Sequence, residues 1–187
     1  MLKDLIKKNR SYRRFYEEKS ISKETLISLV DLARLSPSGK NLQPLKYFLS
    51  NDENPNGIIF PNVAWAGYLK DWDGPIMGER PSAYIIQLVD TTLTNNFGHD
   101  PGIACQSILL GAVELGLGGC IIGSIKKTEL HTMLNLPEHL EIVLIIALGY
   151  PKEKVVIEQI NSDDIKYWRD KNGVHHVPKR SLGDLII

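Results

Sequence analysis

Cysteine is scarce in this 187-residue chain, which contains only Cys105 and Cys120. Two cysteines are too few for a disulfide framework, and they lack the C-x-x-C spacing of a metal or dithiol redox site. Free thiols in a reducing compartment are the simplest interpretation. The sequence therefore excludes a small domain that depends on disulfides for its stability.

The chain also lacks an excess of charge and a long hydrophobic run. Its 22 basic and 22 acidic residues cancel, whereas a nucleic-acid surface or an anionic membrane would favour a basic excess. The longest apolar run, Ile142 to Leu148, has seven residues, far fewer than the ~20 that a membrane-spanning helix needs. The N-terminus shows no apolar segment typical of a signal peptide. We therefore expect a cytoplasmic protein without nucleic-acid or membrane partners.

Several nucleotide and metal motifs are missing. No G-x-G-x-x-G spacing can be drawn through the glycines, and the Walker A and H-E-x-x-H patterns are absent. A nicotinamide cofactor would therefore not be held by a Rossmann unit. His175 and His176 are adjacent and have no spaced partner, so we interpret them as structural or solvent-facing and expect no metal site.

The length suits one domain over residues 1–187, since domains commonly have about 100–200 residues. Hydrophobic periodicity and turn residues predict a mixture of helices and strands. The predicted helices are a short N-terminal one, 22–35 capped by Ser22, 101–117 capped by Asp100, 128–134, a helical turn at Trp168 capped by Ser162, and a last one from Ser181. The predicted strands are 47–49, 83–89 and 141–148, the last of them central, with a turn at 51–57.

The segment Ser36 to Pro44 is a loop with an unusual number of polar groups. Its two prolines fix the backbone, its glycine permits a conformation that other residues resist, and its serine and amide side chains donate and accept hydrogen bonds. Such a loop can direct several uncharged polar groups at one planar ligand. The same residues also suit an ordinary helix stop and turn.

Two further segments have both a functional and a plain interpretation. Arg10, Ser11 and Arg13 lie within a basic cluster that could hold a phosphate or form a solvated face. Trp65, Tyr68 and Trp72 have helical spacing, which fits a core or subunit contact as well as a lid over a substrate.

Residues 116–124 form a glycine-rich segment directly after the apolar helix predicted at 101–117. Glycine lets backbone approach a ligand closely, and exposed amides at this point could bond to the edge of a ring. The apolar helix itself has nonpolar residues on nearly every face and is interrupted by only Gln106, Ser107 and Glu114. A helix of this kind belongs in the middle of a domain or between two subunits.

Taken together, four blocks resemble the nitroreductase family of FMN-dependent oxidoreductases, of which this would be a short member. They occur in that family's order and span nearly the whole chain. The blocks are Arg10-Ser11-x-Arg13-x-Phe15, Ser36-Pro37-Ser38-Gly39-x-Asn41-x-Gln43-Pro44, the helix Ala104 to Leu117 with its glycine-rich exit, and Val177-Pro178-Lys179-Arg180.

The resemblance implies an α+β fold, a three-layer α/β/α sandwich whose mixed, mainly antiparallel sheet is surrounded by helices. It further implies an intertwined homodimer with FMN at the subunit interface. The cofactor contacts that it implies are Arg10, Ser11 and Arg13 at the phosphate and ribityl chain, Pro37, Ser38, Gly39 and Asn41 along the flavin from the other subunit, Cys120, Ile121 and Gly123 beside the ring, and Lys179 and Arg180 closing on the phosphate.

The resemblance also implies a chemistry. NADH or NADPH would deliver hydride to the flavin N5 in a ping-pong cycle, and an electron-poor acceptor such as a nitroaromatic, a quinone or an activated alkene would then be reduced. The sequence offers no catalytic acid, and Trp65, Tyr68 or Trp72 would shape the substrate side. Relatives on this scaffold also include dehalogenating and flavin-cleaving proteins, and a flavin-binding or storage protein is a further alternative. Asn9, Leu45 and Ile122 depart from residues that many members carry.

Overall fold

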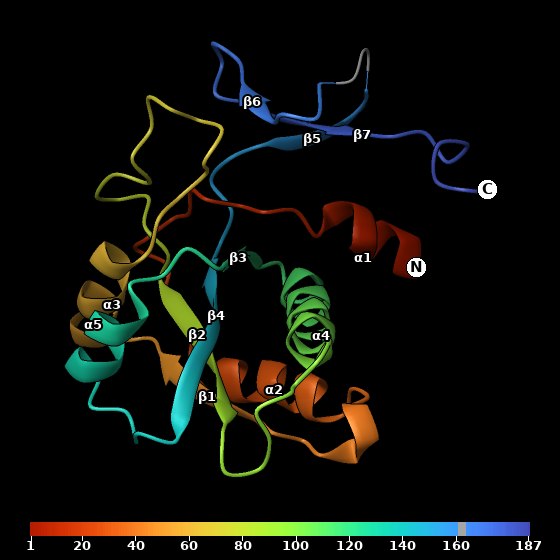
Figure 1. Ribbon diagram of the computed structural model, residues 1–187. Helices are drawn as coiled ribbons and strands as arrows, with labels where there is room; N and C mark the ends of the chain where they lie inside the picture. The colour runs from red at the N-terminus through yellow and green to blue at the C-terminus, as the bar shows by residue number, and fades with distance from the viewer. Residues whose placement is uncertain (161–163) are drawn as a thin grey trace.

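The computed structural model describes residues 1–160 and 164–187 (Figure 1). Its helices are α1 (Leu2–Lys8), α2 (Lys23–Arg34), α3 (Glu53–Ile59), α4 (Asp100–Glu114) and α5 (Lys127–Met133), with single 3-10 turns η1 (Gly39–Asn41) and η2 (Phe60–Asn62). Its strands are β1 (Leu45–Ser50), β2 (Ala83–Asp90), β3 (Gly118–Ile122), β4 (Leu140–Gly149), β5 (Val155–Gln159), β6 (Trp168–Arg169) and β7 (His175–Lys179).

The main sheet has the strand order β1-β2-β4-β3, and every neighbouring pair is antiparallel. The two central strands are the most apolar, and all eight residues of β2 are buried. Ile85 lies opposite Ile146, and Ile86 lies opposite Ile145. Burial on both faces explains why these strands read as continuous apolar runs, and the prediction of a central strand at 141–148 is confirmed.

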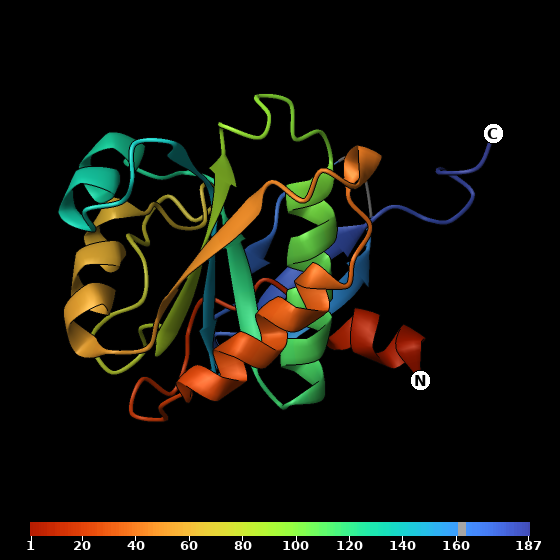
Figure 2. The same cartoon turned by 90° about the horizontal axis from the view of Figure 1, so that it is seen from below.

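Helices cover both faces of this sheet, as Figure 2 shows, with α2 and α4 on one side and α3 and α5 on the other. Each face has its own core. Leu26, Leu29 and Ile108 pack in one core, and Ile59 and Leu130 pack in the other. The predicted three-layer α/β/α sandwich is therefore confirmed.

The two long helices begin near where the sequence predicts, by different means. The Ser22 side chain accepts a hydrogen bond from the Thr25 amide at 3.1 Å, so α2 has the expected N-cap. The predicted N-cap of α4 is wrong, because Asp100 lies inside the helix and His99 occupies the cap position without a side-chain bond. The Asp100 carboxylate binds the loop after α2 instead.

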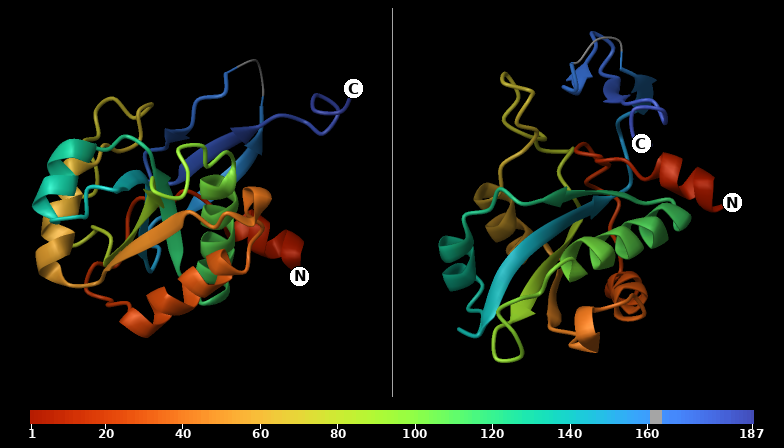
Figure 3. Two further views of the ribbon diagram at one scale, coloured as in Figure 1. Left: turned by 60° about the horizontal axis from the view of Figure 1, so that its bottom comes forward. Right: turned by 45° about the vertical axis from the view of Figure 1, so that its right-hand side comes forward.

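A small second sheet, with the order β5-β7-β6, lies beyond the end of the main sheet and beside α1 (Figures 1 and 3). β5 and β7 are parallel, and β6 is antiparallel to β7. Trp168 was predicted in a helical turn but belongs to β6, where its ring stacks on His176 with centroids 4.0 Å apart. The predicted cap Ser162 lies outside the described residues.

Three other local predictions are wrong. The turn predicted at 51–57 is largely helix α3, because Pro55 lies in its first turn, where a missing amide costs no hydrogen bond. Residues 63–82 form a long loop in place of a helix with an aromatic stripe. Ser181 and Asp184 make the hydrogen bonds of a capping box, yet only a turn follows them.

The described residues contain neither a membrane-spanning helix nor a cluster of metal ligands. None of the helices is long and apolar enough to cross a membrane. In the same part of the chain, no group of three or more histidine, cysteine, aspartate or glutamate side chains is placed to hold a metal ion.

Candidate functional site

The N-terminal basic segment pairs with the free edge of the main sheet. Ser11 forms a parallel bridge with Gly119 of β3, and the Tyr12 amide donates to the Gly119 carbonyl at 3.0 Å. Glycine is needed at this edge, since a Cβ on Gly118 would lie 2.5 Å from the Tyr12 ring. The pairing places Arg10 and Arg13 beside the exit of α4, although more than one hundred residues separate these segments in sequence.

Two carboxylates hold this segment in place. Glu79 accepts from both ends of the Arg14 guanidinium, and the Arg14 Nη2 to Glu79 Oε1 distance is 2.6 Å. These hydrogen bonds lower the pKa of Glu79 below its ordinary value. Glu153, whose side chain is fully buried, accepts from the Arg13 backbone amide and from Arg169 Nη2, the latter at 2.9 Å. Both carboxylates are thus directed at Arg14, Arg169 and backbone, and neither neutralises the Arg13 guanidinium.

A cavity of about 310 Å³ opens beside this segment, and we call it the basic cavity. Five of its lining residues are predicted cofactor contacts: Arg10, Ser11, Arg13, Ile121 and Lys179. The others are Asn9, Gln106, Leu109, Gly119, Tyr167, His175 and Val177. The lining therefore has three cations and no carboxylate. It is suited to an anion with several oxygen acceptors, such as a phosphate.

Some polar groups of the basic cavity have few hydrogen-bond partners among the described residues, or none. Arg10 Nε is buried without a partner. Arg13 is only 8% exposed, and its Nη1 reaches the Ser11 carbonyl at 3.2 Å and His175 Nε2 at 3.3 Å. A buried guanidinium with so few partners favours an anionic ligand.

His175 is a neutral donor in the wall of this cavity. Burial, together with the charge of the neighbouring Arg13, lowers the pKa of His175 to about 4. A guanidinium only donates hydrogen bonds, so Nε2 must accept from Arg13 and the ring proton lies on Nδ1. Nδ1 is buried and has no partner in the described chain. His175 is only 1% exposed, so it is not solvent-facing, and its contact with Arg13 agrees with the structural interpretation.

A second cavity, of about 210 Å³, adjoins the first, and we call it the β3 cavity. Arg13 and Ile121 line both cavities. Its remaining lining residues include Trp65, Cys120 and Gly123 from the predicted set, together with Ala64, Ala66, Gly67, Ile122 and Ser124. The Trp65 indole nitrogen is buried there without a partner in the part of the chain described.

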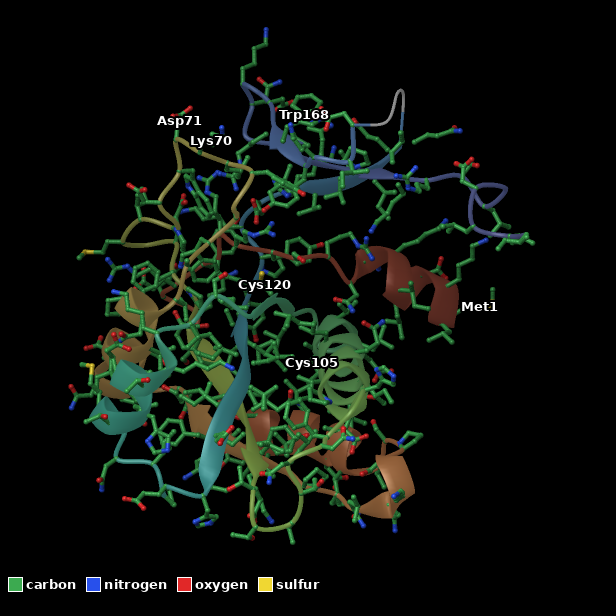
Figure 4. All side chains as sticks on the ribbon, viewed as in Figure 1. Met1, Lys70, Asp71, Cys105, Cys120 and Trp168 are labelled. Carbon is green, nitrogen blue, oxygen red and sulfur yellow. The ribbon has the colours of Figure 1, made fainter. Side chains whose placement is uncertain are left out.

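Cys120 lies on β3 (Figure 4), and it lines the β3 cavity. Burial raises the pKa of its thiol above the ordinary value, and Sγ lies 3.6 Å from the Ile121 carbonyl oxygen. The thiol is therefore protonated at neutral pH and is a poor nucleophile. Both cysteines are free, as predicted.

The polar loop packs along the N-terminal half of α4, where Ser36 Oγ lies 2.7 Å from Ser107 Oγ. Asp100 accepts from Ser38 Oγ at 2.6 Å and from the Gly39 amide at 2.9 Å. Lys40, Asn41 and Gln43 adopt positive φ angles of 53°, 57° and 50°. Non-glycine residues adopt such angles at an energetic cost, so the surrounding hydrogen bonds must hold the loop in this shape.

Within one chain the loop is separate from the basic and β3 cavities. Pro37 and Ser38 line two hollows of about 290 and 500 Å³, and Gly39 lines the larger one. No residue of the basic cavity lines either hollow. Both groups lie along α4, where Asp100 lines the two hollows and Gln106, six residues later and about 9 Å along the helix, lines the basic cavity. The predicted cofactor residues therefore form two groups that one chain does not bring together.

Four predicted residues line none of these cavities and hollows. Arg180 is exposed, and Asn41 contributes its carbonyl to Gln43 Nε2 at 3.2 Å. Tyr68 packs on Tyr167 with ring centroids 4.9 Å apart, and Trp72 lies under the Arg169 guanidinium at 4.6 Å. Only Trp65 of the three aromatic residues lines a cavity, while the other two fix the long loop to the small sheet.

Sequence reasoning missed four polar or aromatic residues of the basic cavity, namely Asn9, Gln106, Tyr167 and His175. Gln106 gave a signal, as one of the few polar residues on an apolar helix, and its Oε1 accepts from Asn9 Nδ2 at 3.3 Å. His175 gave a weaker signal as half of a histidine pair. Tyr167 gave none, because its position depends on the small sheet and on an Arg13 guanidinium 4.9 Å from its ring centre.

Comparison with known proteins identifies the family. The family model described as nitroreductase matches residues 6–58 and 69–150. This chain belongs to the nitroreductase family. The match includes the basic segment, the polar loop, α4 and β3, which are three of the four blocks noted in the sequence. The fourth block, Val177 to Arg180, lies beyond the matched residues.

Three similar proteins illustrate the range of this family. The iodotyrosine deiodinase of Thermotoga neapolitana is 28% identical over 172 residues, which are 82% of this chain and 90% of that protein. The NADPH-flavin oxidoreductase of Vibrio harveyi is 27% identical over 113 residues, 51% of this chain and 47% of its own length. A nitroreductase family protein of Streptococcus pneumoniae has a crystal structure that superposes with a TM-score of 0.70 at 18% identity, covering 90% of this chain and all of the other.

Proposed function

We propose that this nitroreductase-family oxidoreductase is a single-domain, FMN-dependent enzyme that takes electrons from NADH or NADPH. The observation that carries the proposal is the basic cavity, whose three cations are accompanied by no carboxylate. FMN carries a phosphate dianion, and two separate basic segments of the chain converge where it would bind. The similarity to an NADPH-flavin oxidoreductase supports the choice of flavin and nicotinamide.

The residues present fit this cofactor. Arg10, Arg13 and Lys179 would hold the phosphate, and Ser11 would add a hydroxyl. Lys179 is exposed and lies at the end of β7, from which its long side chain can close over the phosphate. The unpartnered Nδ1 proton of His175 would donate to an acceptor of the ribityl chain or phosphate. Arg180 is proposed as an outer contact only, since it lines neither cavity.

The β3 cavity would receive the ring. When bound, FMN supplies the transfer of two electrons from a nicotinamide to an electron-poor acceptor such as a nitroaromatic, a quinone or an activated alkene. Cys120, Ile121 and Gly123 provide the backbone and apolar surface beside it, and Arg13 at the border of both cavities supplies positive charge. Cys120 stays protonated, so the protein contributes electrostatic stabilisation and binding with no nucleophile of its own.

A second subunit would complete the site. Pro37, Ser38, Gly39 and Asn41 share no cavity with the basic residues within one chain, which agrees with the expectation that they act on the partner's flavin. Asp100 positions this loop by binding Ser38 and Gly39. We therefore propose a homodimer with two equivalent composite sites.

The decisive experiment is the visible spectrum of FMN-loaded, desalted protein, recorded without oxygen before and after addition of NADPH and then NADH. A retained flavin band that either nucleotide bleaches supports the oxidoreductase. A retained band that neither bleaches contradicts the nicotinamide step and favours a flavin-binding or storage protein. Loss of the band on desalting contradicts the cofactor assignment.

A second candidate function is reductive dehalogenation of an iodinated phenol. It is favoured by the iodotyrosine deiodinase of Thermotoga neapolitana, which aligns with 82% of this chain. The test is to incubate the dithionite-reduced, FMN-loaded protein with 3-iodotyrosine and to measure iodide and tyrosine. Stoichiometric release of iodide supports this candidate, and reoxidation by a quinone with no iodide release contradicts it.

A further inference from the structure

The largest of the pockets described lies away from both cofactor cavities, at the beginning of β2, and we call it the β2 pocket. It has a volume of about 620 Å³. Its lining comes from the connection before α2, the first turns of α3 and the segment that enters β2: Glu17, Glu18, Ser20, Asn51, Glu53, Asn56, Gly57, Phe60, Met77, Arg80, Pro81, Ser82 and Tyr84. These segments meet at one side of the sandwich in Figure 2. The pocket shares no residue with the basic or β3 cavity.

Three polar atoms of the β2 pocket are buried without a partner among the described residues. They are Arg80 Nε, Ser82 Oγ and the Tyr84 hydroxyl. Tyr84 is 1% exposed and Ser82 is 8% exposed. Buried polar groups are normally hydrogen-bonded, and a group of three at one pocket indicates that a ligand or water supplies their partners. All three residues line the pocket.

The charges at this inner end favour an anionic group. The Arg80 guanidinium lies over the Phe60 ring at 4.2 Å. No carboxylate of the described residues is within ion-pair distance of it. Burial holds the pKa of Tyr84 far above its ordinary value, so its hydroxyl is a neutral donor. Arg80, Ser82 and Tyr84 can all donate to one carboxylate.

The remainder of the pocket has the opposite charge. Glu17, Glu18 and Glu53 line it, and Glu18 and Glu53 are exposed. Glu17 accepts from the amides of Gly78 and Arg80, which fixes the backbone that carries Arg80. Three carboxylates against one guanidinium would repel a simple anion, yet they would attract the ammonium group of a molecule that carries both charges.

Hydrogen bonds within the chain fix the framework of the β2 pocket. Asn56 Nδ2 donates to the Ser82 carbonyl at 2.9 Å, and Asn56 Oδ1 accepts from Ser50 Oγ at 2.6 Å. Tyr84 pairs with Ser50 across β1 and β2. These bonds fix Ser82 and Tyr84 relative to each other, and preorganised donors lose little entropy on binding.

We propose that the β2 pocket binds a small zwitterion, specifically a free α-amino acid. Its carboxylate accepts from Arg80, Ser82 and Tyr84, and its ammonium group faces Glu17, Glu18 and Glu53. The volume accommodates the side chain of any standard amino acid. This site is independent of the flavin function, because none of the predicted cofactor residues lines it.

The test is a thermal-shift screen of the FMN-loaded protein with each of the twenty standard amino acids at 10 mM, followed by titration calorimetry of the compounds that stabilise it. Acetate and methylammonium serve as probes for each charge alone. We expect at least one amino acid to bind saturably, and both single-charge probes to bind at least tenfold more weakly. Failure of all twenty to bind overturns the proposal, as does equal binding of acetate.

Variants locate the site. Tyr84→Phe removes one donor and keeps the ring, so the dissociation constant should rise about ten- to hundredfold while the protein remains folded. Arg80→Gln should have an effect at least as large. Tyr150→Phe, which removes a hydroxyl outside the pocket, should leave the dissociation constant within twofold. Binding that is unchanged in both Tyr84→Phe and Arg80→Gln would place the ligand elsewhere and overturn the assignment.

Discussion

Arg13 is the residue on which most of the candidate site depends. Its side chain lines both cavities, stacks on Tyr167 and bonds to His175, while its backbone amide is held by Glu153. The nearby carboxylates are occupied elsewhere, so the guanidinium retains its charge for a ligand. A single residue thereby links the phosphate end of the proposed cofactor site to the ring end.

Arg13→Gln should weaken FMN binding about ten- to hundredfold, because hydrogen bonds to charged groups contribute about 1.5–3 kcal/mol. The measurement is a fluorescence titration of the apoprotein with FMN. Arg14→Gln is the matched control, since the Arg14 guanidinium binds Glu79 and lines neither cavity. It should lower the free energy of unfolding and leave FMN affinity within threefold. Equal FMN affinity of wild type and Arg13→Gln would contradict the proposed phosphate site.

His175 makes stability depend on pH in a defined window. Its pKa is about 4 in the folded chain and 6.5 ordinarily, so the unfolded chain binds more protons between these values. Neutral His175 therefore contributes to the free energy of unfolding in full above pH 6.5. This contribution, about 2–3 kcal/mol, is lost as the pH falls toward 4.

Urea unfolding of the FMN-free protein at pH 7.0, 6.0, 5.0 and 4.5 measures this effect. His175→Asn should flatten the decline in unfolding free energy over that range. The control His99→Asn changes an exposed histidine and should keep the decline. An identical pH profile for wild type and His175→Asn would show that His175 is not the titrating group.

At the scale of elements, the basic segment is positioned by its pairing with β3, which packs against α4. Gly119 has the N-terminal segment on one side and the body of the sheet on the other. A Cβ there would lie 2.7 Å from both the Ala147 carbonyl oxygen and Leu109 Cδ2. Backbone cannot move aside easily, so glycine at this position allows both contacts.

Gly119→Ala should therefore destabilise the protein by about 1–3 kcal/mol through overpacking. Gly102→Ala in α4 is the control, since a Cβ at Gly102 meets nothing within 4 Å and alanine is the better helix former by about 0.5–1 kcal/mol. Urea unfolding of the two variants should move the midpoints in opposite directions. A Gly119→Ala variant as stable as wild type would mean that β3 and the N-terminal segment are packed less closely than described.

At the scale of the whole molecule, the proposed site requires two chains. Within one chain the basic cavity and the hollows beside the polar loop share no lining residue, and we expect the flavin to contact both groups. A composite site has a specific consequence for mixed dimers, because each site takes the basic residues of one chain and the loop of the other.

Co-expression of Arg13→Gln and Gly39→Trp chains with different tags tests this arrangement. Each variant alone should lose FMN, the second because the indole fills the space beside the loop. The purified heterodimer should regain about one FMN per dimer, since one of its two sites combines an intact cavity with an intact loop. A heterodimer that binds no FMN would show that both groups act within the same chain.

Much of the fold could be predicted from local pattern. The apolar runs at 83–89 and 141–148 are the buried central strands, and Ser22 caps α2 as its position indicates. The predictions that failed depend on distant contacts. Asp100 has the right chemistry for a cap but binds the loop after α2, and Trp168 belongs to a strand only because β7 lies beside it.

The sequence by itself determined the hydrophobic layers, the family and the residue types of a phosphate site, because periodicity and short motifs are local properties of the chain. Only the tertiary structure decided which of those residues meet. The pairing of Ser11 with Gly119 brings Arg13 to β3, and the small sheet brings His175 to Arg13. The same folding leaves the polar loop lining other hollows, and it buries the Tyr84 hydroxyl and Arg80 Nε without a hydrogen-bond partner among the described residues. Burial and charge balance depend on segments that are far apart in sequence.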